Sequence, residues 1–445
     1  MAVRGEGVYI WDADGNRYLD LSGSAAVNFI GHGLPEISAA MAEQAAKLEF
    51  VHTSQFTTPV AEAYAEELLA FAGLNSSDHF RGGAVYFTCG GSESIETALK
   101  LARQYQVEIG QPARHQILSR QQSYHGSTLG ALSVSGNKRR REIYLPMVRE
   151  FPHVGMPYCY RCDFDCTDGC RNCGQQYAAE LERAIETTSG ETAAFIFEPV
   201  SGATLGAVVP PPGYLQAVAE ICRRHGVLLI ADEVMTGMGR TGRNFAVDHW
   251  LAGHGDVKPD IVVTAKGLSS GYAPLGAVIA SGKVVDAIAT GAGAGVFLHG
   301  FTYNAHPISL AAGRAVLRYL QEKHLVEAAD SSRPGTPAAH FKQALESLRN
   351  ENAVGDVRGI GLLWAIEFVA DKSTKRPFPP EQNFAGRVAA AGLKHGLLVY
   401  PMQGSVDGLS GDHLLLAPPA IITPEQIAWA AGQLRVAVSE ALTSL

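Results

Sequence analysis

Four short apolar segments of this chain each run directly into a polar residue or a glycine pair. They cover residues 84–88, 193–197, 227–231 and 261–265, and are followed by Gly90-Gly91, Glu198-Pro199, Asp232 and Lys266. Helix-like stretches separate the segments, which is the order expected of an α/β protein with a parallel sheet. Open parallel sheets bind ligands at the carboxyl ends of their strands. We therefore expect these polar residues to meet at one site.

The pattern changes after about residue 310 to longer amphipathic stretches, with a Ser/Pro/Gly interruption at residues 331–337 and strand-like runs around Leu362 and Leu397. We predict an α/β fold whose large domain has a mostly parallel central sheet flanked by helices, followed by a smaller α+β C-terminal domain. The expected boundaries are 51–309 for the large domain and 310–445 for the small one. Residues 1–50 are expected to form an N-terminal segment that packs with the small domain.

Charge and hydropathy exclude several classes of partner. The formal net charge is −8, and the one dense basic run, Lys138–Arg141, is short and reads as a solvated loop or helix face. We expect no nucleic-acid partner. The first residues lack the apolar core of a secretory signal, and no apolar run approaches the roughly 20 residues of a membrane helix. We expect a cytoplasmic protein without membrane contact.

Five of the seven cysteines crowd into one insertion at about residues 157–174. Four of them form two Cys-x2-Cys pairs, which supply the ligand set of a structural zinc ion. The gap between the pairs is shorter than in usual zinc ribbons, and Cys166 lies inside it. The alternatives are unliganded thiols or a disulfide. The predicted metal ligands are Cys159, Cys162, Cys170 and Cys173.

Lys266 follows an apolar run that reads as a buried strand. Burial lowers the pKa of a lysine and frees its amine for Schiff-base formation. A single lysine in such a place more often begins a helix or lies on the surface. A catalytic role for Lys266 therefore depends on which other residues lie near it. Asp232 ends the strongest strand candidate, where a buried carboxylate needs a cationic partner. A protonated pyridine nitrogen is such a partner, while a helix cap or an arginine pair is the structural alternative, which Glu233 could serve instead.

Two further segments fit a phosphorylated ring. Cys89-Gly90-Gly91-Ser92 opens onto a stretch with apolar residues at helical spacing, and backbone amides at a helix N-terminus bind phosphate. Tyr124 is placed to stack on a planar ring. Each also has a structural interpretation: the glycine pair could form a tight turn, and Tyr124 could be an ordinary core residue.

The order and wording of these motifs resemble the class III (fold type I) aminotransferases, which depend on pyridoxal 5′-phosphate (PLP), over nearly the whole chain. The matching segments are residues 11–20, 31–35, 87–103, 123–127, 198–200, 229–242, 259–268 and 299–307. Near the C-terminus Gly411-Asp-His-Leu-Leu-Leu-Ala-Pro-Pro is similar to the ω-amine:pyruvate subgroup.

The resemblance implies a role for each matching residue. Lys266 would be the Schiff-base lysine and proton shuttle, and Asp232 would hold the ring nitrogen. Tyr124 and Val234 would flank the ring, Glu198 would contact the cofactor, and Gly91 with Ser92 would bind its phosphate. Thr302 matches a position that reaches the phosphate of the neighbouring subunit, which implies a homodimer with shared active sites.

One feature of the ornithine- and GABA-type members is missing. They carry an arginine paired with a glutamate, and Leu415 and Ala203 stand at the corresponding positions. The mobile arginine of the ω-amine:pyruvate subgroup has no counterpart in residues 406–410. We therefore expect a ping-pong aminotransferase that moves an amino group from an amine or ω-amino compound of some bulk to a 2-oxo acid such as pyruvate.

Other reactions share the same lysine and fold, because the pose of the substrate selects the bond that breaks. An amino-acid epimerase, an aminomutase or a phospho-lyase of the same family is the first alternative. A zinc-organised, non-catalytic interaction protein on the same scaffold is a distant one, disfavoured because Lys266 and Asp232 are both present.

Overall fold

A seven-stranded sheet forms the centre of the protein, in a computed structural model that describes residues 1–73, 80–164, 170, 172–251 and 257–445. In spatial order its strands are β4 (Ala84–Thr88), β10 (Gly276–Ala280), β9 (Ile261–Thr264), β8 (Leu228–Asp232), β7 (Thr192–Phe197), β5 (Gln116–Arg120) and β6 (His153–Val154). From β9 to β6 all neighbours are parallel, whereas β10 is antiparallel to both β4 and β9. The mostly parallel central sheet and the four predicted strands are confirmed.

Both faces of this sheet are buried. In β8, Leu228 and Ile230 belong to one apolar core and Leu229 and Ala231 to the other, because successive side chains of a strand point to opposite faces. One core is completed by α4 (Gly91–Glu108), α5 (Leu129–Val134) and α9 (Gly282–Thr290). The other is completed by α3 (Pro59–Gly73), α7 (Cys173–Thr187), α8 (Tyr214–His225) and α10 (Pro307–Glu322).

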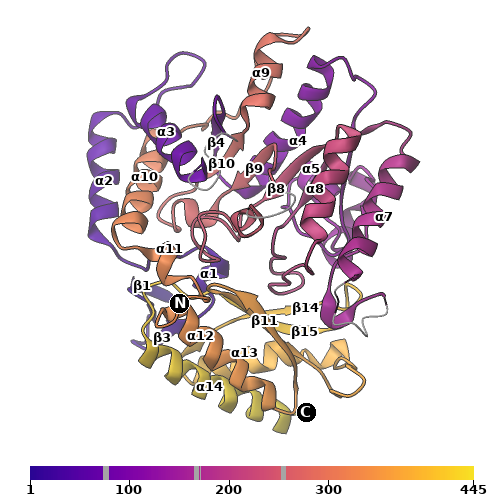
Figure 1. Cartoon of the computed structure of the whole chain (residues 1–445). Coiled ribbons are helices and arrows are strands. Elements are labelled where there is room, and N and C mark those ends of the chain that lie inside the picture. Colours follow the sequence, from indigo (N-terminus) through magenta and orange to yellow (C-terminus); the bar gives the residue numbers. More distant parts are fainter. Residues whose placement is uncertain (74–79, 165–169, 171, 252–256) are drawn as a thin grey trace.

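Two smaller sheets lie on the other side of the molecule (Figure 1). One is antiparallel and consists of β11 (Val354–Ile360), β12 (Leu363–Phe368), β15 (Asp412–Leu416) and β14 (Tyr400–Gln403). The other joins β1 (Ala2–Glu6), β2 (Tyr9–Asp12) and β3 (Arg17–Asp20) to β13 (Leu397–Leu398). Helices α12 (Pro337–Glu346), α13 (Phe384–Lys394) and α14 (Pro424–Thr443) lie beside these sheets.

The parallel pairing of β13 with β3 supports our proposal that the N-terminal segment packs with a small C-terminal domain. Helix α2 (Pro35–Lys47) instead packs against α10. The boundaries at residues 50 and 309 remain part of that proposal. The other short helices are α1 (Gly23–Ala26), α6 (Lys138–Arg141) and α11 (Leu325–Ala328), and the 3-10 turns are η1 (Glu142–Met147), η2 (Cys159–Arg161), η3 (Ala246–Trp250), η4 (Lys266–Leu268), η5 (Ser347–Asn350) and η6 (Pro380–Gln382).

Arg240, in the segment after β8, fastens three parts of the chain together. Its buried guanidinium donates to the carbonyl oxygens of Ala417, at 3.0 Å, and of Asn28, at 2.8 Å. The guanidinium also lies over the Phe29 ring, 4.7 Å from its centroid, within the range of about 6 Å for a cation–π contact. Burial lowers the pKa of Arg240 to about 9. The segment between β8 and β9 is thereby held against the N-terminal and C-terminal parts.

Among the helices of the described residues, none has the length and apolar character required to cross a membrane.

Candidate active site

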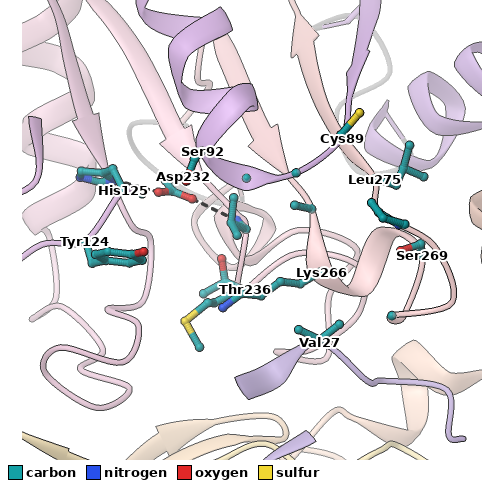
Figure 2. A pocket seen from close by; sticks show the side chains of 18 of the residues that line it. Val27, Cys89, Ser92, Tyr124, His125, Asp232, Thr236, Lys266, Ser269 and Leu275 are labelled. Atoms are coloured by element: carbon teal, nitrogen blue, oxygen red, sulfur yellow. Dashed lines mark hydrogen bonds and ion pairs between the residues drawn. The ribbon is translucent and has the colours of Figure 1, made fainter. Parts of the chain in front are cut away.

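The residues that follow β4, β7, β8 and β9 line one cavity of about 480 Å³. Figure 2 shows Lys266, Asp232, Ser92 and Tyr124 around it. Every cofactor residue predicted from the sequence except Thr302 lines this cavity, namely Gly91, Ser92, Tyr124, Glu198, Asp232, Val234 and Lys266. Strand ends far apart in the sequence therefore meet, as a parallel sheet requires.

Lys266 begins turn η4, with Ala265 between it and the end of β9, and has a backbone φ of +43°. Residues other than glycine rarely adopt this conformation, and such strain is concentrated at functional sites. The side chain is half-buried, and burial lowers its pKa to about 8, although the charges of Asp232 and Glu198 partly oppose this shift. Its Nζ has neither a hydrogen bond nor an ion pair within the described part of the chain. The amine is therefore available as a nucleophile.

Asp232 is buried at the end of β8 and is held by two partners. Its Oδ2 lies 2.7 Å from Nδ1 of His125, and its Oδ1 accepts a hydrogen bond from the Val234 amide at 3.1 Å (Figure 2). The sequence motif contained His125, but nothing in it assigned this contact. The pairing fixes the direction in which the carboxylate faces the cavity.

The neighbouring Glu233 has the structural role considered for it. Its Oε1 accepts from the Val247 amide at 2.8 Å, and its Oε2 accepts from the Thr236 hydroxyl. Burial raises its pKa to about 7. Asp232 is thus left to face the cavity.

Glu198 offers one oxygen to the site. Its Oε1 accepts from the Gly202 amide at 2.9 Å, while its buried Oε2 has no partner among the described residues. Burial raises the pKa of this carboxyl. An unsatisfied buried oxygen is costly, which fits a group that contacts a ligand.

The N-terminus of α4 forms a narrow cradle. No side chain caps it at Gly90. A Cβ on Gly91 would lie 3.1 Å from Val234, and one on Gly126, where φ is +140°, would lie 2.6 Å from the Ser92 hydroxyl oxygen. The Ser127 amide donates to that oxygen at 3.0 Å. Small residues therefore leave uncapped amides of a helix N-terminus open to an anion.

These groups fit PLP. The α4 N-terminus matches its phosphate, Asp232 its ring nitrogen and Lys266 its aldehyde carbon. Tyr124 and Val234 line the same cavity and offer the surfaces that would flank the ring. The site and the fold together define a PLP-dependent transferase of fold type I.

The chain belongs to the class III aminotransferases: it matches the family described as "Aminotransferase class-III" over residues 1–438. The uncharacterized aminotransferase YodT of Bacillus subtilis (strain 168) is 40% identical over 422 residues, which cover 94% of this chain and 90% of YodT. These aminotransferases use PLP.

Two solved structures show the same fold. A thermostable (S)-enantioselective ω-transaminase from Thermomicrobium roseum is 38% identical, with a TM-score of 0.87 over 99% of this chain and 92% of that one. An amine transaminase from an uncultivated Pseudomonas species, solved in its PLP-bound form, is 34% identical, with a TM-score of 0.88 over 100% of this chain and 94% of that one. The fold class and the aminotransferase activity expected from the sequence are confirmed.

Arg140 does not line the cavity itself, but it contacts Tyr124 of the cavity wall, and the sequence did not reveal this contact. The basic run was expected to be solvated, and Lys138 and Arg139 on α6 are indeed exposed, but Arg140 is half-buried. Its guanidinium carbon lies 4.5 Å from the centroid of the Tyr124 ring. Its charge is one of the influences that lower the pKa of Lys266, after burial. Within the described residues the guanidinium has no carboxylate partner.

Leu415 and Ala203, at the positions where a charged pair was considered from the resemblance to ornithine- and GABA-type members, form packed apolar surface. Both are buried in one cluster with Val200 and Leu363. Leu415 pairs with Ala365 across β15 and β12. Because the cluster is closed by side-chain packing, it offers no cation to a carboxylate.

The remaining predicted residues lie outside the cavity. Thr302 is exposed in this single chain. Sγ atoms of Cys159, Cys170 and Cys173 gather within 4.8 Å of one another. Cys162 is not part of this close group, and its Sγ lies 3.8 Å from the Tyr177 hydroxyl, whereas Cys166 is outside the described residues. Zinc at these cysteines remains a proposal.

Proposed function

We propose that this aminotransferase takes the amino group of an amine or ω-amino compound and passes it to a 2-oxo acid such as pyruvate, in a ping-pong reaction. The observation that carries the proposal is the apolar packing of Leu415 and Ala203 beside an otherwise complete site. A buried arginine for a second carboxylate is missing there. The ω-transaminase and amine transaminase neighbours support the same donor class.

Bound PLP supplies an electron sink for the bonds of the substrate carbon. Lys266 would hold this cofactor through its Nζ, and the same amine would serve as the base that accepts the proton of the amine-bearing carbon and as the acid that donates it again. Asp232, positioned by His125, would face the ring nitrogen and favour its protonated form, and the α4 N-terminus would bind the phosphate. Glu198 would offer its free oxygen as a further contact.

We further propose that Arg140 binds the carboxylate of the 2-oxo acid. An arginine fork matches a carboxylate geometrically, and the guanidinium lies over Tyr124, a residue of the cavity wall. Its lack of a carboxylate partner among the described residues leaves it open to an incoming anion. The amine side chain would meet the apolar part of the wall, which includes Val27, Val200 and Leu275.

The proposal includes a homodimer with shared sites. Phe56, Leu298 and Tyr303 are exposed apolar side chains, and Thr302 precedes Tyr303 in the sequence. Exposed apolar surface is commonly buried in protein interfaces. Light scattering of the purified protein would test the dimer. The cytoplasmic location expected from the sequence remains a prediction.

The proposed reaction is tested by adding amine donors to the PLP-loaded enzyme without any acceptor. An aminotransferase should convert up to one cofactor per site into pyridoxamine phosphate and release one carbonyl product. Pyruvate should then restore PLP and yield alanine. Turnover or racemisation with unconverted cofactor would instead indicate a lyase or an epimerase. Conversion by α-amino acids but by none of the amines would contradict the proposed donor class.

A further inference from the structure

The cysteine-rich insertion brings thiols from two separate stretches together. Sγ atoms of Cys159, Cys170 and Cys173 all lie within 4.8 Å of one another. Four sulfur ligands at about 2.3 Å from one zinc ion are about 3.8 Å apart. The three thiols are therefore close to the spacing of a tetrahedral thiolate site before any metal draws them in.

Cys162 supplies the fourth thiol. Cys162 follows the turn η2, three residues after Cys159. The Tyr177 hydroxyl is 3.8 Å from Cys162 Sγ, on the same side of α7. The described cysteines are all free of disulfides. Three thiols thus lie together, and the Cys162 thiol lies beside Tyr177 of the helix that Cys173 begins.

We propose that Cys159, Cys162, Cys170 and Cys173 bind one structural zinc ion. Soft thiolate ligands select zinc over calcium or magnesium, and a closed set of four leaves no open position for catalysis. The site does not line the PLP cavity. The proposal is therefore independent of the proposed substrates.

The turn that carries two of the cysteines is joined to the C-terminal sheet. The Tyr158 hydroxyl and the Arg161 guanidinium both contact the buried Glu367 carboxylate of β12, the latter at 2.7 Å. Arg358 of β11 lies 2.9 Å from the same carboxylate. Its guanidinium also donates to the Gly206 carbonyl oxygen at 2.7 Å. This buried network links the insertion to β12 and to the loop after β7.

Apolar contacts also join the insertion to the loop after β7. Met156 and Tyr158 of the insertion pack with Leu205 and Val208 of that loop. The loop includes Ala203, whose carbonyl oxygen lies 2.8 Å from His413 Nε2. A zinc ion at the four cysteines would hold the turn so that Tyr158 and Arg161 stay directed at Glu367. Its function would be to keep the insertion docked on the C-terminal sheet.

The site is tested first by metal analysis of the full-length enzyme, expressed with zinc in the medium and purified without a metal-binding tag. We expect about one zinc per chain, retained on dialysis. The paired variant C159S/C173S should lose it. The control Cys222→Ala, a buried cysteine on α8 away from the cluster, should keep it.

Because the paired variant could fail to fold, the wild-type protein is also reloaded with Co²⁺ alone. Four thiolates around Co²⁺ give intense ligand-field bands at wavelengths longer than those of PLP, and we expect these bands at one equivalent. Removal of the metal should lower the unfolding temperature by about 5 °C or more. Wild-type protein that holds less than about 0.1 zinc per chain and gives no Co²⁺ bands when reduced would overturn the proposal. A disulfide mapped between any two of the four cysteines after blocking free thiols at lysis would overturn it equally.

Discussion

Nδ1 of His125 lies 2.7 Å from Oδ2 of Asp232, and both side chains are buried at the base of the PLP cavity. The contact joins the loop after β5 to the end of β8. A buried hydrogen bond to a charged group contributes about 1.5 to 3 kcal/mol. His125 thus acts as a positioning residue for the carboxylate that faces the cofactor.

Replacing His125 tests this role. We expect His125→Ala to lower kcat/KM for the amine about ten- to hundred-fold, because Asp232 loses the donor that orients it. His125→Asn, which keeps an N–H near the place of Nδ1, should recover most of the loss. The measurement is steady-state kinetics across a range of pH with cofactor content checked in each variant. Equal losses in the two variants would mean that the ring is required for packing alone.

The pKa of Lys266 predicts how cofactor capture depends on pH. Only the neutral amine attacks the PLP aldehyde, and burial lowers the lysine pKa to about 8. The rate of covalent capture by the cofactor-free protein should rise with pH, level off above pH 8 and fall about tenfold per pH unit below it. Stopped-flow absorbance gives this rate. A rate that still rises steeply toward pH 10 would show an ordinary lysine pKa.

The proposed role of Arg140 predicts different effects on the two half-reactions. Arg140→Ala should raise the KM for pyruvate about ten- to hundred-fold through loss of a charge-assisted pair, while the half-reaction with an amine that lacks a carboxylate stays within about twofold. The matched control is Arg139→Ala, whose exposed side chain contacts Gln403 at 3.2 Å. Rapid-mixing measurement of each half-reaction separates the two effects. A similar loss in both would place Arg140 in support of Tyr124 instead.

The apolar cluster around Leu415 predicts a coupled pair of substitutions. Leu415→Arg alone should destabilise the protein by about 3 to 5 kcal/mol, because it buries a charge without a partner. L415R/A203E, which restores a charge pair at the two positions, should recover part of this loss. The unfolding temperatures of the single and double variants, with Ala203→Glu as the third member, give the coupling. Simple additivity would show that the two positions do not meet as the cluster indicates.

Much of the catalytic site could be predicted because buried strands appear in the sequence as short apolar runs. β4, β7, β8 and β9 are short, apolar runs, and their ends must meet in a parallel sheet. Lys266 and Asp232 were found in this way. The role of Glu233 could be settled only when its contacts with Val247 and Thr236 were known.

Arg140 and His125 show what a sequence pattern leaves out. The run Lys138–Arg141 reads as a solvated charged face, and nothing in it tells which guanidinium turns toward Tyr124. Arg140 lies on the short helix α6, where its backbone amide donates to the Asn137 side chain at 3.1 Å. The contact between His125 and Asp232 joins residues far apart in the chain, so it depends on the sheet order. The spacing of the cysteines likewise did not reveal that Tyr158 and Arg161 join their turn to Glu367.

The site assignment is tested most directly by reducing the PLP-loaded enzyme with borohydride and mapping the modified peptide by mass spectrometry. Reduction fixes the cofactor to the lysine that holds it. We predict a single phosphopyridoxyl group on Lys266, with Lys266→Ala giving no modified peptide and no amino transfer. A modification on another lysine, or wild-type activity in the Lys266→Ala variant, would contradict the account.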